Sequence, residues 1–278
     1  MATTTPEKSE RPAKTGMTRR QRKRLSLWIQ YAIFVAIVLF IVFTANWPQL
    51  KEAFFNVDVA ARMFPRVITI GLANTLLYTV CSFLFGLLVG IVIALMRLSS
   101  VGPYRWVATA YVELFRGLPA LLVLFFVAYG IPNAFPGFEF PGGFLGQVTV
   151  GLGLTAAAYM SETFRAGIQA VPKGQVEAAR TLGMSSGRAL VTIVLPQAFR
   201  IVIPPLTNEI ILLTKDSSLV YVLGVTTQQY ELTKFSQDFL NKAVNPTPLV
   251  VGGLLYLCIT LPLSQLVRRL EIRHARAR

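Results

Sequence analysis

Charged side chains are scarce in this chain, and so are the residues that most often carry catalysis or bind metals. Only 14% of its 278 residues are charged, whereas an average soluble domain carries roughly 25%. There is one histidine, and there are two cysteines. Cys81 and Cys258 both fall in apolar stretches, so they indicate neither a disulfide framework nor a metal site.

The chain also lacks the residues that bind and hydrolyse nucleotides. No glycine-rich loop ends in Gly-Lys-Ser or Gly-Lys-Thr, so there is no phosphate cradle. The single histidine, His274, stands next to Arg273 in the basic C-terminal segment, and a histidine-dependent nucleophile inside the membrane would have no base. We therefore expect no enzymatic activity and no cofactor, and any ATP-driven work must come from a partner.

Hydrophobic residues, in contrast, make up 54% of the chain. An α-helix needs about 20 apolar residues to cross a bilayer. Uncharged stretches that reach this length are residues 25–50, 67–96, 117–138, 140–161 and 243–267. The sequence predicts an all-α membrane protein, a bundle of about six transmembrane helices. The predicted spans are 28–45, 66–96, 106–131, 144–167, 201–214 and 248–267. The fifth is shorter than the others and is counted because the orientation of the loops on the two sides of the membrane requires it.

The net charge of +14 does not indicate a nucleic-acid partner, because Lys and Arg gather in loops on alternate sides of the spans. Most of the 27 basic residues fall on one side if both termini are cytoplasmic, which agrees with the positive-inside rule. We attribute this charge to topology and to contact with the anionic lipids of the bilayer rather than to the substrate.

The composition divides the chain into four parts. Residues 1–27 form a basic cytoplasmic tail that is expected to be disordered, and residues 28–64 hold an uncleaved first span and an outer loop. Residues 65–270 form the main transmembrane domain, and residues 271–278 form a second basic cytoplasmic tail. An apolar outer piece, 219–225, is too short to cross and is expected to be re-entrant or interfacial.

The largest cytoplasmic loop, residues 168–200, is predicted to hold two short helices. Pro172 can open the first helix, and Gly183 suits a left-handed C-terminal cap. Ser185 or Ser186 can cap the second helix. Periodicity leaves two interpretations open, a helix that docks on another protein and a helix that lies on the inner leaflet.

Charged residues within the third and fourth spans form two pairs with helical spacing. Glu113 and Arg116 are three residues apart, and so are Glu162 and Arg165, so each pair can form a local ion pair. A charge inside the bilayer is costly unless it is paired or hydrated. We interpret the four residues as structural ion pairs, aided by cross-pairing between the spans, and an inner gate is the alternative.

Glu209 lies in the fifth span without a basic residue within one helical turn. Pro204-Pro205 removes two backbone donors just before it, and this is expected to open the helix near the middle of the bilayer. Broken helices beside a lone charge present polar groups to solutes in transporters. We interpret Glu209, with Asn208, as facing the substrate, and an ion pair with a charge from another span, such as Arg116, is the alternative.

The cytoplasmic loop resembles the signature loop of ABC importer permeases. The matching positions, at the spacing of that signature, are Glu-Ala-Ala at 177–179, Gly183, Ile193 and Leu195-Pro196. The resemblance implies a type I ABC importer permease-like fold, in which loop 172–196 carries the helix that couples to the ATP-binding subunit. Carried over, the predicted docking residues are Glu177, Ala178, Ala179 and Gly183.

The resemblance extends from about Pro65 to Leu270, and there it is similar to the polar amino acid subfamily, which imports solutes such as glutamate, glutamine, arginine and histidine. The similar positions are Asn74-Thr75-Leu76, the run from Glu113 to Pro119, Tyr159 with Glu162 and Arg165, Asn208-Glu209 and the run from Lys215 to Leu219. Glutamate permeases of the subfamily also carry Asn-Glu, so no charge preference follows. The first span departs from the pattern and is expected to be peripheral to the pathway.

The resemblance implies the transmembrane subunit of an ATP-driven importer for a polar amino acid in the bacterial cytoplasmic membrane. The implied partners are a cytoplasmic ATP-binding subunit, a second permease chain, alike or different, and an extracytoplasmic solute-binding protein. The alternative is a self-contained secondary transporter or channel without an ATPase. About six spans without a detectable inverted repeat would form a poor complete pathway for such a transporter.

Overall fold

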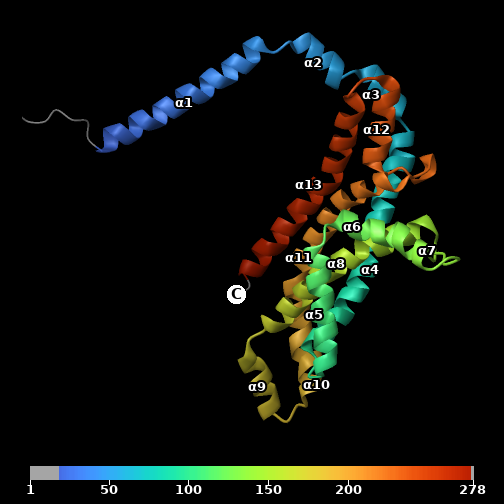
Figure 1. The fold of residues 1–278 in the computed structure, drawn as a ribbon. Coiled ribbons are helices and arrows are strands. Elements are labelled where there is room, and N and C mark those ends of the chain that lie inside the picture. The colour runs from blue at the N-terminus through green and yellow to red at the C-terminus, as the bar shows by residue number, and fades with distance from the viewer. Residues whose placement is uncertain (1–18, 277–278) are drawn as a thin grey trace, which may run out of the picture. The chain divides into compact units, whose positions relative to one another are not determined.

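The structure, a computed structural model, describes residues 19–276 of the chain and the side chains of residues 19–272 (Figure 1). All regular elements in this part are helices, which confirms the predicted all-α class. Residues 1–18 of the predicted tail and the side chain of His274 lie outside the described part. Residues 19–27, which were predicted to be disordered, instead form the first turns of helix α1 (Arg19–Thr44), because no glycine or proline interrupts them.

The chain divides into two compact units, residues 1–52 and residues 53–278. The first unit holds α1, none of whose side chains is buried, and most of α2 (Trp47–Phe54). Residues 53–64, which the sequence grouped with the first span, belong to the second unit. Their helix α3 (Val57–Met63) follows Asn56, whose backbone N–H donates to Thr247 Oγ1 at 3.0 Å, and Met63 at its end is fully buried.

The second unit contains four more helical runs that are long and apolar enough to cross a membrane. They are η1 (Val67–Leu72) with α4 (Ala73–Leu98), α8 (Phe144–Gln169), the run of α10 (Ser186–Ala189), η3 (Leu190–Val194), α11 (Leu195–Asp216) and η4 (Ser217–Leu223), and α13 (Thr247–Arg276). The apolar piece 219–225 is therefore largely the end of the fifth helix and not a separate re-entrant segment. With α1 and one bent pair, the described residues hold up to six spans.

The third predicted span, 106–131, falls on the bent pair, so the prediction of a single helix there is wrong. The pair consists of α5 (Gly102–Gly117), then α6 (Ala120–Phe125), η2 (Phe126–Gly130) and α7 (Ile131–Ala134), with a bend of 109° between the two halves. Leu118 between them is extended, with φ −94° and ψ 141°. Pro119 causes the break, because its ring disfavours a helical conformation in the residue before it.

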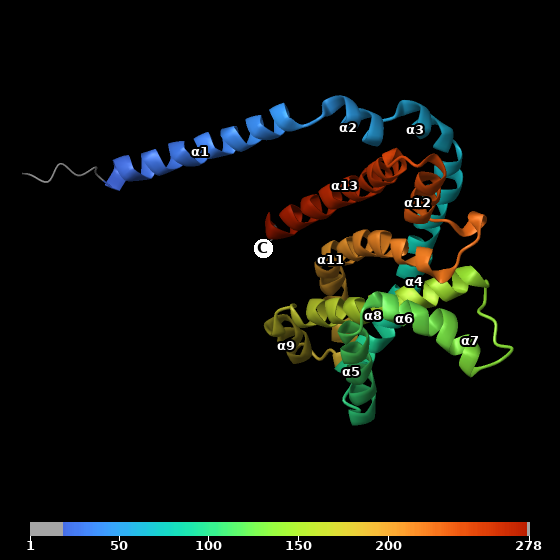
Figure 2. The ribbon, with the colours of Figure 1, turned by 45° about the horizontal axis from the view of Figure 1, so that its top comes forward.

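The fifth span, in contrast, is not opened by Pro204-Pro205, and this prediction is also wrong. Helix α11 continues through both prolines to Asp216. Each proline lacks only the bond that its N–H would have made to the carbonyl four residues earlier. The contacts that α11 makes with α8 and α13 on its two sides hold the helix together despite these losses (Figure 2).

Helices α4 and α8 pack closely against each other in the core of the bundle. Gly90 of α4 faces α8 so closely that a Cβ atom there would lie 3.0 Å from the Cβ of Met160. Gly153 of α8 likewise has no space, since an added Cβ would lie 2.6 Å from Phe85 Cδ1. The small residues let the backbones pack tightly, as is common between membrane helices. Both α5 and α11 pack against this pair of helices.

The two ends of the second unit differ (Figure 1). One end, the α9 end, carries the loop with α9 (Lys173–Thr181) and α10. The other, the α12 end, carries η5 (Thr227–Gln229) and α12 (Leu232–Ala243). Asn74 of α4 connects α4 to the segment around η5, since its Nδ2 donates to the carbonyls of Gln228 and Tyr230 at 2.7 and 3.0 Å.

Glu231 is the N-cap residue of α12 and is fully buried. Its carboxylate accepts the backbone N–H groups of Thr233 and Lys234, both at 2.6 Å, and the hydroxyl of Tyr256 at 2.9 Å. Burial raises the pKa of Glu231 above its ordinary value, although these hydrogen bonds work in the opposite direction. Glu231 therefore fixes the start of α12 against α13.

Candidate functional site

The loop between α8 and α10 folds as two short helices with the predicted caps. Pro172 precedes α9, and Gly183 just beyond its end has φ +85°. The Gly183 N–H donates to the Arg180 carbonyl at 3.0 Å, and the Met184 N–H donates to the Ala179 carbonyl at 3.1 Å. This pair of bonds is a Schellman motif, for which glycine is the favoured residue.

The second helix, α10, is capped by Ser185, whose Oγ accepts the backbone N–H of Arg188 at 3.4 Å. It passes through η3 directly into α11, so the loop is continuous with the fifth span. The loop therefore leads into the helix that carries Glu209.

The predicted docking residues do not all face outward. Glu177, Ala178 and Gly183 are exposed, whereas Ala179 is only 3% exposed. Ala179 is therefore corrected from a docking residue to a packing residue, because its small side chain lets α9 pack against α10 and η3. The sequence reasoning missed Leu182, which is 85% exposed at the end of α9.

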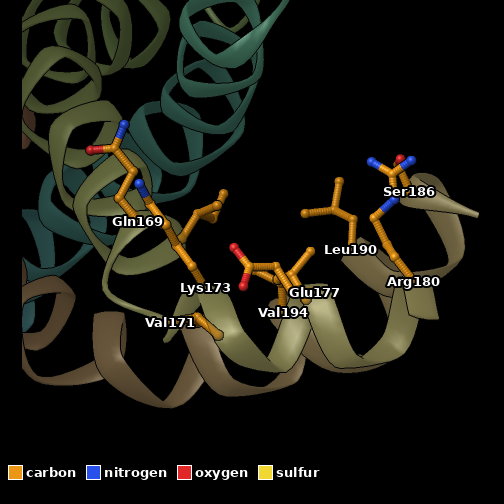
Figure 3. A pocket seen from close by; sticks show the side chains of 10 residues that line it. Gln169, Val171, Lys173, Glu177, Arg180, Ser186, Leu190 and Val194 are labelled. Carbon is orange, nitrogen blue, oxygen red and sulfur yellow. The ribbon is translucent and has the colours of Figure 1, made fainter. Parts of the chain in front are cut away.

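A cavity of about 760 Å³ lies between α9, the end of α8 and the start of the fifth span. Its residues are Ile168, Gln169, Val171, Lys173, Val176, Glu177, Arg180, Ser186, Leu190 and Val194. Figure 3 shows the Glu177 carboxylate pointing into the open space, with Gln169 on one side and Ser186 on the other. The walls are largely apolar, and Glu177 is their one carboxylate. Lys173 and Arg180 line the cavity as well, so two cations accompany this carboxylate.

Charged residues of three helices meet at Glu162 of α8. Its carboxylate forms an ion pair with Arg97 of α4 and another with Arg165, whose Nη2 lies 2.7 Å from Oε2. Arg116 of α5 is farther away, with Nη1 at 3.8 Å from Oε1. The sequence predicted the local Glu162–Arg165 pair but missed Arg97, which directly follows an uncharged stretch and was assigned to a loop.

The predicted local pair between Glu113 and Arg116 is wrong for the described residues, which hold no ion pair between the two. Arg116 turns toward Glu162 instead, and its guanidinium carbon lies 5.4 Å from the centre of the Tyr159 ring. The packing of α5 on α8, which also brings the Tyr111 hydroxyl within 2.8 Å of the Leu154 carbonyl, explains this preference. Glu113 is exposed.

A second cavity, of about 310 Å³, lies between the break in the third span, α8 and α11. Its residues are Leu118, Pro119, Ala120, Leu152, Thr155, Ala156, Tyr159, Glu209, Leu212, Leu213 and Asp216. Glu209 thus lines a cavity, and the described residues hold no ion pair between it and Arg116. Asn208 does not line it, because neighbouring residues of a helix point about 100° apart. The substrate-facing role of Asn208 stays a prediction.

Comparison with known proteins agrees with this architecture. The family model of the binding-protein-dependent transport system inner membrane component matches residues 86–276. The chain is 38% identical to the arginine transport system permease protein ArtQ of Bacillus subtilis (strain 168), over 78% of this chain and 96% of that protein. It is 39% identical to the probable glutamine ABC transporter permease protein GlnM of the same organism, over 73% of this chain and 91% of that protein.

Among solved structures, a chain from the crystal structure of an amino acid ABC transporter with histidines superposes with a TM-score of 0.69. The two chains are 33% identical, and the match covers 77% of this chain and 96% of that chain. The family model covers more than half of the chain, and the curated relatives are matched along nearly their whole length. This chain therefore belongs to the binding-protein-dependent transport system inner membrane components, the permease subunits of ABC importers.

Proposed function

We propose that this chain forms the translocation pathway of an ATP-driven importer for a polar amino acid and binds a separate ATPase through α9. The observation that carries the proposal is α9 itself, a short helix with an exposed face that runs through α10 into the fifth span. The arginine and glutamine permeases to which the chain is similar support an amino acid as the solute. Membership of a binding-protein-dependent family disfavours a self-contained transporter.

The α9 end faces the cytoplasm in this proposal. The chain then has both termini on the cytoplasmic side, in agreement with the excess of basic residues there. An ATP-binding subunit contacts Glu177, Ala178, Leu182 and Gly183, and one of its side chains enters the 760 Å³ cavity. An extracytoplasmic solute-binding protein delivers the amino acid at the α12 end, and a second permease chain completes the pathway.

The cluster around Glu162 acts as an inner gate. It joins α4, α5 and α8, and the Arg116 contact is the longest of its three ion pairs. A movement of α5 relative to α8 breaks that contact first and leaves the other two intact. The solute passes the cavity lined by Glu209, which lies beside the bend of the third span.

Co-purification tests the proposed function. The chain is expressed together with its candidate ATPase and binding protein, purified through a tag on the permease, and reconstituted in liposomes. The ATPase is expected to elute with the permease, and its rate of hydrolysis is expected to rise when the binding protein carries its amino acid. Uphill amino acid uptake by the permease in liposomes without any ATPase would refute the proposal.

A further inference from the structure

We propose that an acyl chain of a phospholipid from the inner leaflet binds in an apolar groove between α4, α8 and α11. The groove has a volume of about 330 Å³, and its lining residues come from the stretches 87–95, 164–168 and 195–206. Every side chain in this lining is apolar. The groove differs in this respect from the two cavities described above, both of which contain charged side chains.

The groove lies on a different side of the α8–α11 pair from the cavity that holds Glu209. Helices α8 and α11 line both hollows, whereas of the two α4 lines only the groove and the third span lines only the cavity. On α8, Phe164 of the groove and Tyr159 of the cavity are five residues apart and point about 140° away from each other. A second permease chain completes the pathway on the side of the third span, so the groove faces lipid. This step alone rests on the proposed function.

The depth and the length of the groove match one leaflet of the bilayer. Its three stretches lie at the α9 end of their helices, because α4 ends at Leu98, α8 ends at Gln169 and α11 begins at Leu195. Along α11 the groove extends from Leu195 to Leu206, a rise of roughly 16 Å. Half of a hydrocarbon core measures about 15 Å. With the α9 end in the cytoplasm, the groove spans the inner leaflet.

The groove is closed at its floor and open along one side. Ala94, Ala198 and Val202 are at most 3% exposed and form the floor, whereas Leu95 and Phe199 are 52% and 62% exposed and border the mouth. An empty groove would forfeit dispersion contacts along its walls. The acyl chains of the surrounding lipid are the apolar groups available at this depth, so one of them fills the groove.

A transmembrane helix is too wide for this groove. A helix with its side chains is about 10 Å across, so a 12 Å length of it occupies roughly 900 Å³, far more than the 330 Å³ available. Helix α1, or a span of a second chain, would therefore place only single side chains in the groove and leave the rest unfilled. An unbranched acyl chain follows a narrow groove along its whole length.

The inner end of the groove meets the cavity beside α9. Ile168 lines both hollows, and Leu195 of the groove directly follows Val194 of the cavity. A bound acyl chain therefore packs against the base of the loop that carries α9. The lipid becomes part of the packing at the junction between this loop and the bundle.

Photo-crosslinking of the permease, purified with its candidate ATPase and placed in nanodiscs, tests the site. The probes are two phosphatidylglycerols, one with a diazirine at the end of an acyl chain and one with the diazirine near the glycerol. The first probe is expected to label Leu87 and Leu206, which line the deep end of the groove. The second is expected to label Leu95 and Leu195, which line its inner end. Mass spectrometry of the peptides locates the label.

Two exposed leucines of α13 provide the controls. Leu261 and Leu266 are 53% and 47% exposed and do not line the groove, so they report on the lipid that surrounds any membrane helix. The groove residues are expected to carry at least fivefold more label than these two. Leu95→Trp places an indole in the mouth and is expected to lower the labelling of Leu206 at least threefold. Leu266→Trp, the same substitution at similar exposure, should leave that labelling unchanged.

Three results would overturn the site, and the first two use the wild-type protein. Equal labelling of the groove and of α13 would mean that lipid only surrounds the bundle. No labelling of the groove would mean that a protein segment, such as α1 or a second permease chain, covers it. Undiminished labelling in Leu95→Trp would mean that no acyl chain enters it. None of these measurements involves uptake, so each of the three results would leave the proposed function standing.

Discussion

Arg97 and Glu162 form an ion pair between α4 and α8, although they are 65 residues apart in the chain. Both side chains are largely covered, at 16% and 22% exposure. Arg165 and Arg116 share the same carboxylate, so three cations depend on one anion. The energetic consequence is asymmetric, because loss of the shared carboxylate leaves every arginine of the cluster without its partner.

Glu162→Gln is therefore expected to destabilise the protein more than loss of any one arginine. Removing one partner of a buried pair typically costs 3–5 kcal/mol, whereas exposed pairs are worth at most about 1 kcal/mol. For this partly covered cluster we expect a loss of about 1 to 3 kcal/mol, measured as a lower melting temperature in detergent. Asp238→Asn, which removes an exposed pair with Lys242 in α12, should change the melting temperature little. Equal effects of the two substitutions would contradict the account of the cluster.

Gly183→Arg is expected to leave the protein inserted in the membrane but to abolish uptake. The substitution places a large cation on the exposed docking surface and a non-glycine residue at φ +85°. Gly137→Arg is a matched control at the other end of the bundle, because Gly137 has φ +87° and open space around it as well. Both substitutions carry the same backbone cost of roughly 1–2 kcal/mol. Uptake into vesicles and stimulation of the ATPase by the loaded binding protein are the measurements, and only Gly183→Arg should lose them.

Elements that depend on local sequence could be predicted, and those that depend on tertiary contacts could not. The length of the apolar stretches predicted the spans, and Pro172 and Gly183 predicted the ends of α9. The prolines show that local sequence alone does not predict where a helix breaks. Pro119 breaks its helix, whereas Pro204-Pro205 does not, because α11 is packed between two other helices.

The candidate site was predicted only in part, for a related reason. Glu162–Arg165 and the exposed Glu177 follow from helical spacing and the loop signature. Arg97 joins its cluster through the packing of α4 on α8, which no spacing along the chain encodes. Asp216 could have been found, since a seven-residue spacing from Glu209 places both on one helical face.

Leu182→Ser is expected to weaken binding of the ATPase without affecting the fold. Leu182 is 85% exposed, so its apolar surface contributes nothing to the packing of this chain and is available to a partner. Val244→Ser is the matched control, because Val244 is 88% exposed at the opposite end. Co-elution of the ATPase during size-exclusion chromatography should fall for Leu182→Ser only. Undiminished co-elution would show that α9 docks without this residue.

The buried carboxyl of Glu231 should make the stability of the protein depend on pH. Burial raises its pKa in the folded state, so the folded state binds this proton more tightly than the unfolded state does. The contribution to stability is full below the unfolded pKa of about 4.3 and is lost as the pH rises through the raised folded value. Glu231→Gln removes this titration while keeping a side chain of similar shape that can still accept one of the N–H groups of α12.

The melting temperatures of the two proteins, measured from pH 4.5 to pH 7.5, check this expectation. They should be similar at the acidic end, where the wild-type carboxyl is neutral like the amide, and the wild type should lose stability relative to Glu231→Gln as the pH rises. In the opposite trend, the melting temperature of the wild type would rise relative to that of the variant toward neutral pH. This would mean that the hydrogen bonds from Thr233, Lys234 and Tyr256 outweigh the cost of burial. In that case Glu231 would hold α12 as a charged cap.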